Sequence, residues 1–222
     1  MQRGRALTAF GLSELMEPPT CLIVADGVWP QPAVIASALR GPTTVLACDG
    51  ALARCHQHGL TVHAVVGDMD SLDAEDFLQM DDVRVVERLD QNSNDLSKAI
   101  DHALEEGHMN LRIVGATGGD VQHEWANVLE CARRDVNIEL MDDRSRFLFL
   151  AEKEQHEVPT NLGGTFSLMA FVDVEMLNLS GGRYSISNDR LAMGSRGLHN
   201  VANEAVINLS YDSGRLVLIL PQ

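Results

Sequence analysis

The stretch LRIVGATGGDVQHEWANVLECARR (residues 111–134) predicts a strand, a glycine-rich turn and a helix in direct succession. Its apolar start at 111–115 is typical of a buried strand, and residues 122–134 have a helical pattern. The same order recurs along the first part of the chain. Strands are expected at 21–25, 44–48, 63–67, 83–86 and 137–141, and helices at about 32–40, 51–58, 73–80 and 94–107. Such alternation is typical of βαβ units, so we expect a three-layer, mostly parallel, Rossmann-like α/β sheet.

The helical periodicity ends near residue 145. Short strand-like pieces follow, separated by Gly, Asn, Asp and Ser, at 147–151, 165–172, 174–179, 204–210 and 215–220. Asp212-Ser213-Gly214 lies between two apolar runs and predicts a hairpin turn. We therefore expect two domains, an α/β domain at 1–144 and a small antiparallel β-sandwich at 145–222.

Composition excludes several classes of partner. The 222 residues include 17 basic and 32 acidic ones, giving a formal charge of -15. Such a chain is poorly suited to nucleic acid or to an anionic membrane surface, both of which attract Lys and Arg. No apolar run approaches the length of a membrane span. The four cysteines form no CxxC pair and no zinc spacing, so we expect a reduced, cytoplasmic protein.

Carboxylates follow several of the predicted strands. Asp49 follows the strand at 44–48, Asp68 and Asp70 follow the strand at 63–67, and Asp90 and Asp95 follow the strand at 83–86. The carboxyl ends of parallel strands lie at one edge of a sheet, where α/β proteins bind ligands. Clustered carboxylates there suit Mg²⁺, which accepts one or two of them together with substrate phosphates. The alternative for Gly67–Ser71 is an ordinary acidic helix start.

Two further features lie near these carboxylates. Asn94 is expected to cap the helix at 94–107, and Lys98, near its beginning, requires an anionic partner, either a phosphate or Asp95. The glycines of 115–119 would let a backbone approach phosphate closely, although tight turns use glycine without any ligand. Trp125, in the helix after this loop, is expected in the core.

Together these motifs resemble those of the thiamine pyrophosphokinase family. The matching segments, in the order of that family, are Asp49-Gly50, GDMDS (67–71), DQNSND with Lys98 (90–98), GATGGDVQH with Asn127 (115–127), and SGGRYSISND (180–189) followed by His199-Asn200. The resemblance implies a homodimer with active sites between subunits. It also implies Mg²⁺-dependent transfer of diphosphate from ATP to the hydroxyl of thiamine, which releases AMP.

The resemblance assigns roles position by position. It makes Asp68, Asp70 and Asp95 the catalytic, metal-binding aspartates. ATP and its phosphates are assigned to Asp49, Gln91, Lys98, Gly118, Gly119 and His123. Thiamine is assigned to Gln122, Tyr184, His199 and Asn200. For Tyr184 the alternative is packing within the sandwich.

Some positions depart from the family pattern. Asp120 stands where Arg is usual, and it would repel phosphates unless a metal intervenes. Gln122 replaces a charged residue, His199 replaces Ser, Asn94 replaces Thr, and Asp26 replaces Asn. Two alternatives therefore stay open: a related pyrophosphokinase that acts on another alcohol, and a ligand-binding homologue without turnover.

Overall fold

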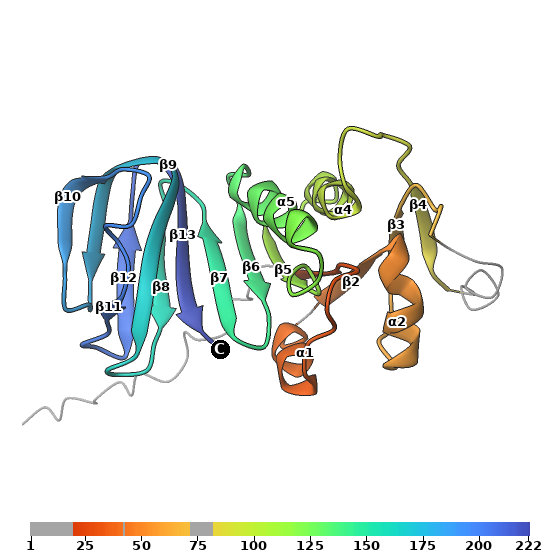
Figure 1. Ribbon diagram of the computed structural model, residues 1–222, viewed down its shortest axis with the longest axis horizontal. Helices are drawn as coiled ribbons and strands as arrows, with labels where there is room; N and C mark the ends of the chain where they lie inside the picture. Colours follow the sequence, from red (N-terminus) through yellow and green to blue (C-terminus); the bar gives the residue numbers. More distant parts are fainter. Residues whose placement is uncertain (1–19, 42, 72–81) are drawn as a thin grey trace, which may run out of the picture.

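The computed structural model describes residues 20–41, 43–71 and 82–222, whose strands join in one sheet (Figure 1). The strand order is β4-β3-β2-β1-β5-β6-β7-β13-β9-β12-β8. Every neighbouring pair from β4 to β6 is parallel, as the sequence predicted. These strands are β1 (Thr20–Val24), β2 (Thr43–Cys48), β3 (Ala64–Gly67), β4 (Arg84–Glu87), β5 (Asn110–Val114) and β6 (Asn137–Met141).

Helices cover both faces of the parallel strands. Figure 1 shows α1 (Pro32–Ala38) and α2 (Leu52–Gln57) on one face, and α4 (Asp95–Glu105) and α5 (Val121–Ala132) on the other. A short 3-10 helix, η1 (Asp49–Ala51), precedes α2. The predicted helix at 73–80 lies outside the described residues.

The strand order reverses between β1 and β5. From β1 the chain proceeds to β2 and β3 on one side, whereas from β5 it proceeds to β6 on the other. Loops that leave two adjacent strands in opposite directions open a crevice at the carboxyl edge of a sheet. The fold thus places a ligand cavity between the loops after β1 and β5.

Antiparallel strands continue the sheet beyond Met141. They are β7 (Ser145–Leu150), β8 (Gln155–Pro159), β9 (Thr165–Ser180), β10 (Ile186–Leu191), β11 (Asn200–Val201), β12 (Val206–Ser210) and β13 (Ser213–Pro221). The predicted strands at 165–172 and 174–179 form the single strand β9. Its first half pairs with β13, and its second half pairs with β12 and β10. Phe166, Leu177, Ile207 and Leu218 belong to the buried cluster that these strands share.

The predicted hairpin at Asp212–Gly214 is wrong. Neither β12 nor β13 pairs with the other; both pair with β9 in nearly continuous register, from Asn208↔Ser180 to Ser213↔Glu175. Tyr211 is buried in between, with its hydroxyl donating to the carbonyl of Leu150. Gly214 has a φ of 122° and lies against the next strand, so that a Cβ there would be 2.5 Å from the carbonyl oxygen of Asp173. Gly214 therefore lies at an irregularity in the pairing of β13 with β9. The chain does not reverse there, because β12 and β13 follow one another along the same partner strand.

All four cysteines are free and buried. Among the described residues, no helix is both long and apolar enough to cross a membrane.

Candidate active site

A cavity of about 470 Å³ lies at the carboxyl edge of the parallel strands, where the strand order reverses. The loops after β1, β2 and β5 line it together with the first turns of α4 and α5. Its described lining includes the five carboxylates of Asp26, Asp49, Asp95, Asp120 and Glu124, and no Lys or Arg. Anionic phosphates would need a cation here.

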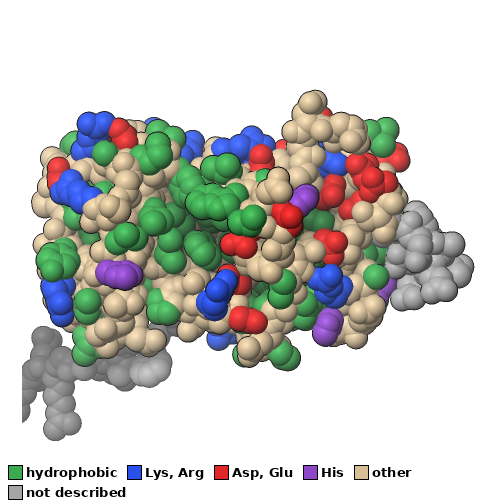
Figure 2. Space-filling view, in the orientation of Figure 1, with side chains coloured by type: hydrophobic (Ala, Val, Ile, Leu, Met, Phe, Trp, Pro, Cys, Tyr) green, Lys and Arg blue, Asp and Glu red, His purple; other side chains and the backbone are tan. Residues whose placement is uncertain are grey.

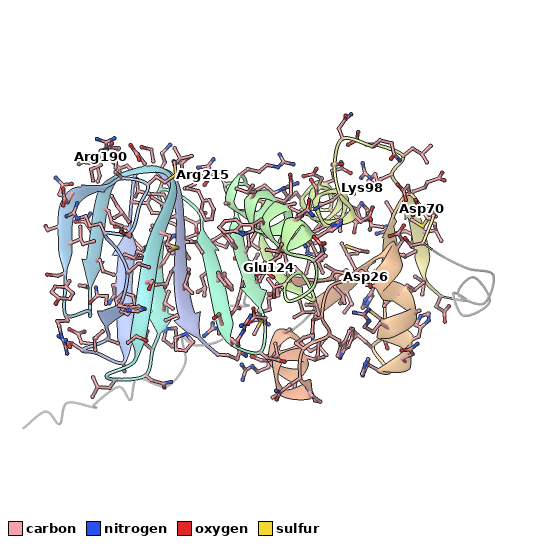
Figure 3. The ribbon with its side chains drawn as sticks, in the orientation of Figure 1. Asp26, Asp70, Lys98, Glu124, Arg190 and Arg215 are labelled. Carbon is pink, nitrogen blue, oxygen red and sulfur yellow. The ribbon has the colours of Figure 1, made fainter. Side chains whose placement is uncertain are left out.

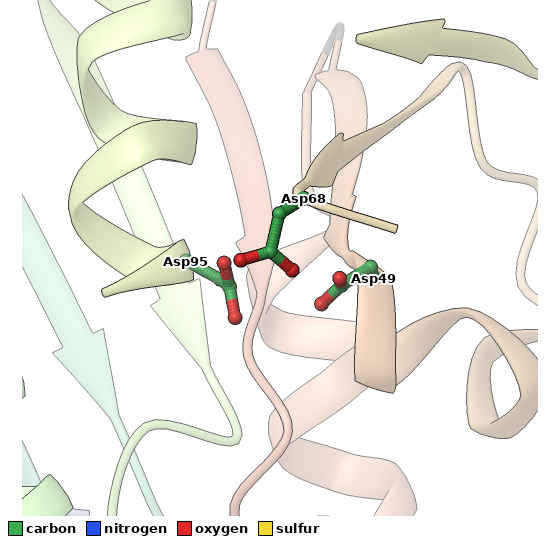
Figure 4. Close-up of side chains that lie close together, drawn as sticks. All are labelled: Asp49, Asp68 and Asp95. Atoms are coloured by element: carbon green, nitrogen blue, oxygen red, sulfur yellow. The ribbon is translucent and has the colours of Figure 1, made fainter. Parts of the chain in front are cut away.

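Three aspartates from different elements meet beside this cavity. Asp49 comes from η1, Asp68 from the end of β3 and Asp95 from the first turn of α4 (Figure 4). One carboxylate oxygen from each lies within 4.8 Å of those of the other two. Three hard oxygen donors at this separation suit a divalent cation such as Mg²⁺.

Asp49 is the buried member of the cluster, with 2% of its surface exposed. Its carboxylate accepts hydrogen bonds from the backbone N–H groups of Gly50 at 2.8 Å and Met69 at 3.1 Å. Burial, together with repulsion from Asp95 and Asp68, nevertheless raises the pKa of Asp49 above its usual value. Gly67 makes the arrangement possible, because a Cβ there would lie 2.6 Å from the Asp49 carboxyl carbon.

Lys98 balances part of the negative charge. Its buried ammonium donates to Asp95 at 2.9 Å and to Asp68 at 3.3 Å. Desolvation lowers the pKa of Lys98, but these carboxylates hold it above its usual value. In turn, desolvation raises the pKa of Asp68, yet hydrogen bonds from Lys98 and Gln91 hold it below its usual value. Of the partners that the sequence left open for Lys98, the structure contains Asp95, and it adds Asp68.

Asp70 lies on the same loop but outside the cluster. It is exposed, and its carboxylate accepts a hydrogen bond from the hydroxyl of Ser71 at 3.1 Å. Ser71 itself lines the cavity, so Asp70 stands near its rim. Met69, between the two aspartates, has a left-handed φ of 66°, a conformation that is costly for a residue with a side chain.

The glycine loop is held by carboxylates. Gly115 and Gly118 have φ values of 70° and 81°, which glycine adopts without strain. The N–H of Gly118 donates to Glu124 at 2.9 Å. Asp120 is the N-cap of α5 and accepts from the N–H groups of Gln122 at 2.7 Å and His123 at 3.3 Å.

Two asparagines join this loop to α4. Asn94 caps α4 as predicted, accepting from Ser97 N–H at 2.9 Å. Its amide also donates to Asn127 at 2.9 Å, and Asn127 donates to the carbonyl of Ala116 at 2.9 Å. The first turn of α4, which contains Asp95, is thus connected to the glycine loop through side-chain amides.

The structure brings most of the expected phosphate-side residues together. Gly119, His123 and Asp49 line the cavity, and Gln91 and Lys98 contact Asp68. Gln122 is exposed and is not part of the lining. Sequence reasoning assigned no role to Asp26 or Glu124, although both line the cavity and appear in Figure 3 with Asp70 and Lys98. The position of Asp26 directly after a predicted parallel strand was the available signal.

Three of the four residues expected to bind the alcohol, Tyr184, His199 and Asn200, lie in the antiparallel part of the chain. Tyr184 and Asn200 line a second cavity of about 370 Å³ formed by the antiparallel strands. Tyr184 is 66% exposed and so does not pack within the β core. Buried Asn200 holds its backbone on both sides, accepting from Tyr184 N–H at 3.0 Å and donating to its carbonyl at 2.8 Å. His199 is exposed and outside this lining.

Trp125 is not in the core, contrary to the prediction. It is 61% exposed, as are Val121 (62%) and Leu129 (52%), four residues before and after it on α5. The opposite side of the helix contains buried Cys131 and Ala132. Hydrophobic side chains gather over the middle of the face in Figure 2, where Figure 1 has α5 and the strands beside it.

Comparison with known proteins agrees with this geometry. Residues 36–141 match the family model described as "Thiamin pyrophosphokinase, catalytic domain". No curated protein matches the chain.

Solved structures of thiamine pyrophosphokinases have a similar fold. The Bacillus subtilis protein has a TM-score of 0.76 at 21% identity, over 91% of this chain and 99% of that one. The Geobacillus thermodenitrificans protein has a TM-score of 0.72 at 22% identity, over 91% and 97%. The yeast protein has a TM-score of 0.70 at 12% identity, over 92% and 86%.

Proposed function

We propose, from the premise that this chain belongs to the thiamine pyrophosphokinase family through residues 36–141, that it transfers diphosphate from ATP to the hydroxyl of thiamine. The products are thiamine diphosphate and AMP. One observation supports this most strongly: Asp49, Asp68 and Asp95 meet at the carboxyl edge of the parallel strands, and Lys98 pairs with two of them, Asp68 and Asp95. The cavity beside them extends to the glycine loop.

The aspartates fit Mg²⁺. Their oxygens lie close together, and the buried carboxylate of Asp49 is repelled by its neighbours, so a cation would relieve that repulsion. We propose Asp68, Asp70 and Asp95 as ligands, with Asp49 as a further one. Bound there, Mg²⁺ would neutralise phosphate charge and polarise the phosphoryl oxygens. Lys98 holds the carboxylates of Asp68 and Asp95 in place through ion pairs at 3.3 Å and 2.9 Å.

The remaining residues have proposed roles in orientation. Gly119 and His123 line the side of the cavity that would receive the phosphates, and Gln91 holds Asp68. Gly118, next to Gly119 in the same loop but outside the lining, is proposed to support that side. Tyr184 would cover one face of thiamine, a contact that suits an aromatic cation. Asn200 fixes the backbone of Tyr184, and Gln122 and His199 are proposed to contact thiamine.

A homodimer would complete the site. The two cavities share no lining residue. Figure 1 shows β10, which contributes residues to the second cavity, at the opposite end of the molecule from β2, β3 and α4. Direct transfer requires the hydroxyl within about 3–3.5 Å of the phosphorus. We therefore propose that a second subunit contributes the alcohol-binding residues, and that Val121, Trp125 and Leu129 face that subunit.

We propose that residues 1–144 and 145–222 act as catalytic and alcohol-binding domains. Their boundary falls in the turn between β6 and β7, where strand pairing changes from parallel to antiparallel. We also propose a cytoplasmic location, which the four free, buried cysteines favour.

A coupled assay of AMP release tests the proposal. Purified protein with MgATP and thiamine should form AMP and thiamine diphosphate in equal amounts, whereas Asp68→Asn should form neither. Equal, slow AMP release by both proteins would contradict the assignment of the catalytic site. Tight binding of MgATP or thiamine without any AMP would favour the non-catalytic homologue.

A second candidate is a pyrophosphokinase for another alcohol. Among the lining residues of the second cavity, Arg196 is the charged one, and a guanidinium does not favour cationic thiamine. Asp189, outside this lining, pairs with Arg196 and neutralises part of its charge. A panel of neutral and anionic alcohols in the same assay separates the two candidates by their kcat/KM values.

A further inference from the structure

The loop after β1 lies between the glycine loop and the aspartate cluster and contacts both. Residues 26–28 all line it. On one side, Gly27 donates its N–H to the carbonyl of Gly115, and Val28 donates to that of Thr117 at 3.2 Å. The contact is close enough to require glycine, because a Cβ on Gly27 would lie 2.4 Å from the Gly115 oxygen. Loop 26–28 is therefore fixed against the glycine loop.

On the other side the loop meets the aspartate cluster. The carboxylate of Asp26 lies against Gly50, where a Cβ would be only 2.7 Å away from it. Gly50 follows Asp49 and donates its N–H to the Asp49 carboxylate at 2.8 Å. Asp26 therefore lies directly beside the segment that carries Asp49 of the aspartate cluster.

Arg54, on α2, holds this loop from behind. Its guanidinium lies 3.3 Å from the Asp26 carboxylate and also donates to the carbonyl of Gly27. A second contact lies next to these elements, since Trp29, directly after the loop, stacks on His58, the C-cap of α2, with ring centroids 4.4 Å apart. Arg54 is not among the residues that line the cavity. Its effect on a ligand would therefore pass through the loop.

We propose that Arg54 is a positioning residue for the nucleotide: by tying α2 to loop 26–28, it sets the separation between the aspartate cluster and the glycine loop. The identity of the nucleotide as ATP rests on the proposed function. Because a planar guanidinium can satisfy a carboxylate and a carbonyl together, Lys is expected to replace it only in part.

Calorimetric titration of the full-length protein with MgATP, without any alcohol, tests this proposal. Losing a charge-assisted hydrogen bond should raise the Kd of Arg54→Met about tenfold, with Arg54→Lys in between. Arg88→Met is the matched control, since Arg88 is similarly exposed and pairs with Glu105 outside the cavity. Its Kd should equal that of the unchanged protein.

Kinetics separate positioning from general damage. Arg54→Met should raise the KM for ATP and leave kcat and the KM for thiamine nearly unchanged, at a Tm like that of Arg88→Met. An unchanged Kd in Arg54→Met, or an equal loss in Arg88→Met, overturns the proposal. If Arg54→Met does not fold, an unchanged Kd in Arg54→Lys overturns it as well. A protein that binds MgATP but transfers nothing would refute the proposed function alone, and the Kd series would still decide the role of Arg54.

Discussion

At the scale of single residues, substitution of Asp70 tests metal binding without disturbing the fold. It is exposed, and apart from the adjoining loop and Ser71 it has no described hydrogen-bond partner, so its substitution should not disturb the core. An amide is a poor ligand for a hard cation. We expect Asp70→Asn to reduce turnover by about two to three powers of ten at an unchanged Tm.

The control for Asp70 is Asp212→Asn, an exposed aspartate of the antiparallel part. It should leave both turnover and Tm unchanged. A wild-type rate of AMP formation in Asp70→Asn would restrict the ligand set to Asp49, Asp68 and Asp95. A much lower Tm would instead give Asp70 a structural role.

At the scale of elements, Asp120 combines two effects that can be separated. It caps α5, and its charge borders the cavity. Asn is as good an N-cap as Asp, so Asp120→Asn should keep the free energy of unfolding within about 0.5 kcal/mol, whereas Asp120→Ala should lose about 1 kcal/mol. Removing the charge should lower the KM for ATP in both variants. Urea unfolding and steady-state kinetics measure the two effects, and an increased KM in Asp120→Asn would instead indicate that the carboxylate helps to bind the nucleotide.

The continuing ribbon of β12 and β13 gives another prediction at this scale. Gly214→Ala would force a Cβ against the backbone of Asp173, at a φ of 122°. Gly59 is the control, since it also has a positive φ, 67°, but nothing within 4 Å of a Cβ. We expect Gly59→Ala to cost about 1 kcal/mol and Gly214→Ala at least twice that in urea unfolding. Equal losses would mean that β13 does not depend on the close contact.

What the sequence predicted, and what it did not, follows from how local each signal is. The parallel strands were predicted because each is a short apolar run between helices. Strands β8 and β10 were not predicted, since QHEVP and ISNDRL have few apolar residues and exist through pairing with β12 and β9. Trp125 was misplaced because periodicity does not tell which apolar face of a helix meets the sheet.

Only part of the candidate site was predictable from the sequence. Asp68 and Asp95 were expected together because the carboxyl ends of parallel strands share one edge. The inclusion of Asp49 in the cluster, instead of Asp70, depends on side-chain directions fixed by Gly67 and by the backbone of Met69. Such directions are tertiary and leave no periodic trace in the sequence.

At the scale of the whole molecule, the distance between the two cavities predicts complementation between subunits. Asp68→Asn damages the proposed metal site, and Tyr184→Ala damages the proposed alcohol site. If each active site combines the parallel half of one subunit with the antiparallel half of the other, a mixed dimer contains one site with both changes and one intact site. Random pairing of coexpressed chains should then restore about a quarter of the wild-type activity, measured at thiamine concentrations below KM. Each variant alone should be nearly inactive under that condition. Activity of the mixture no greater than the sum of the two separate variants would mean that every chain completes its own site.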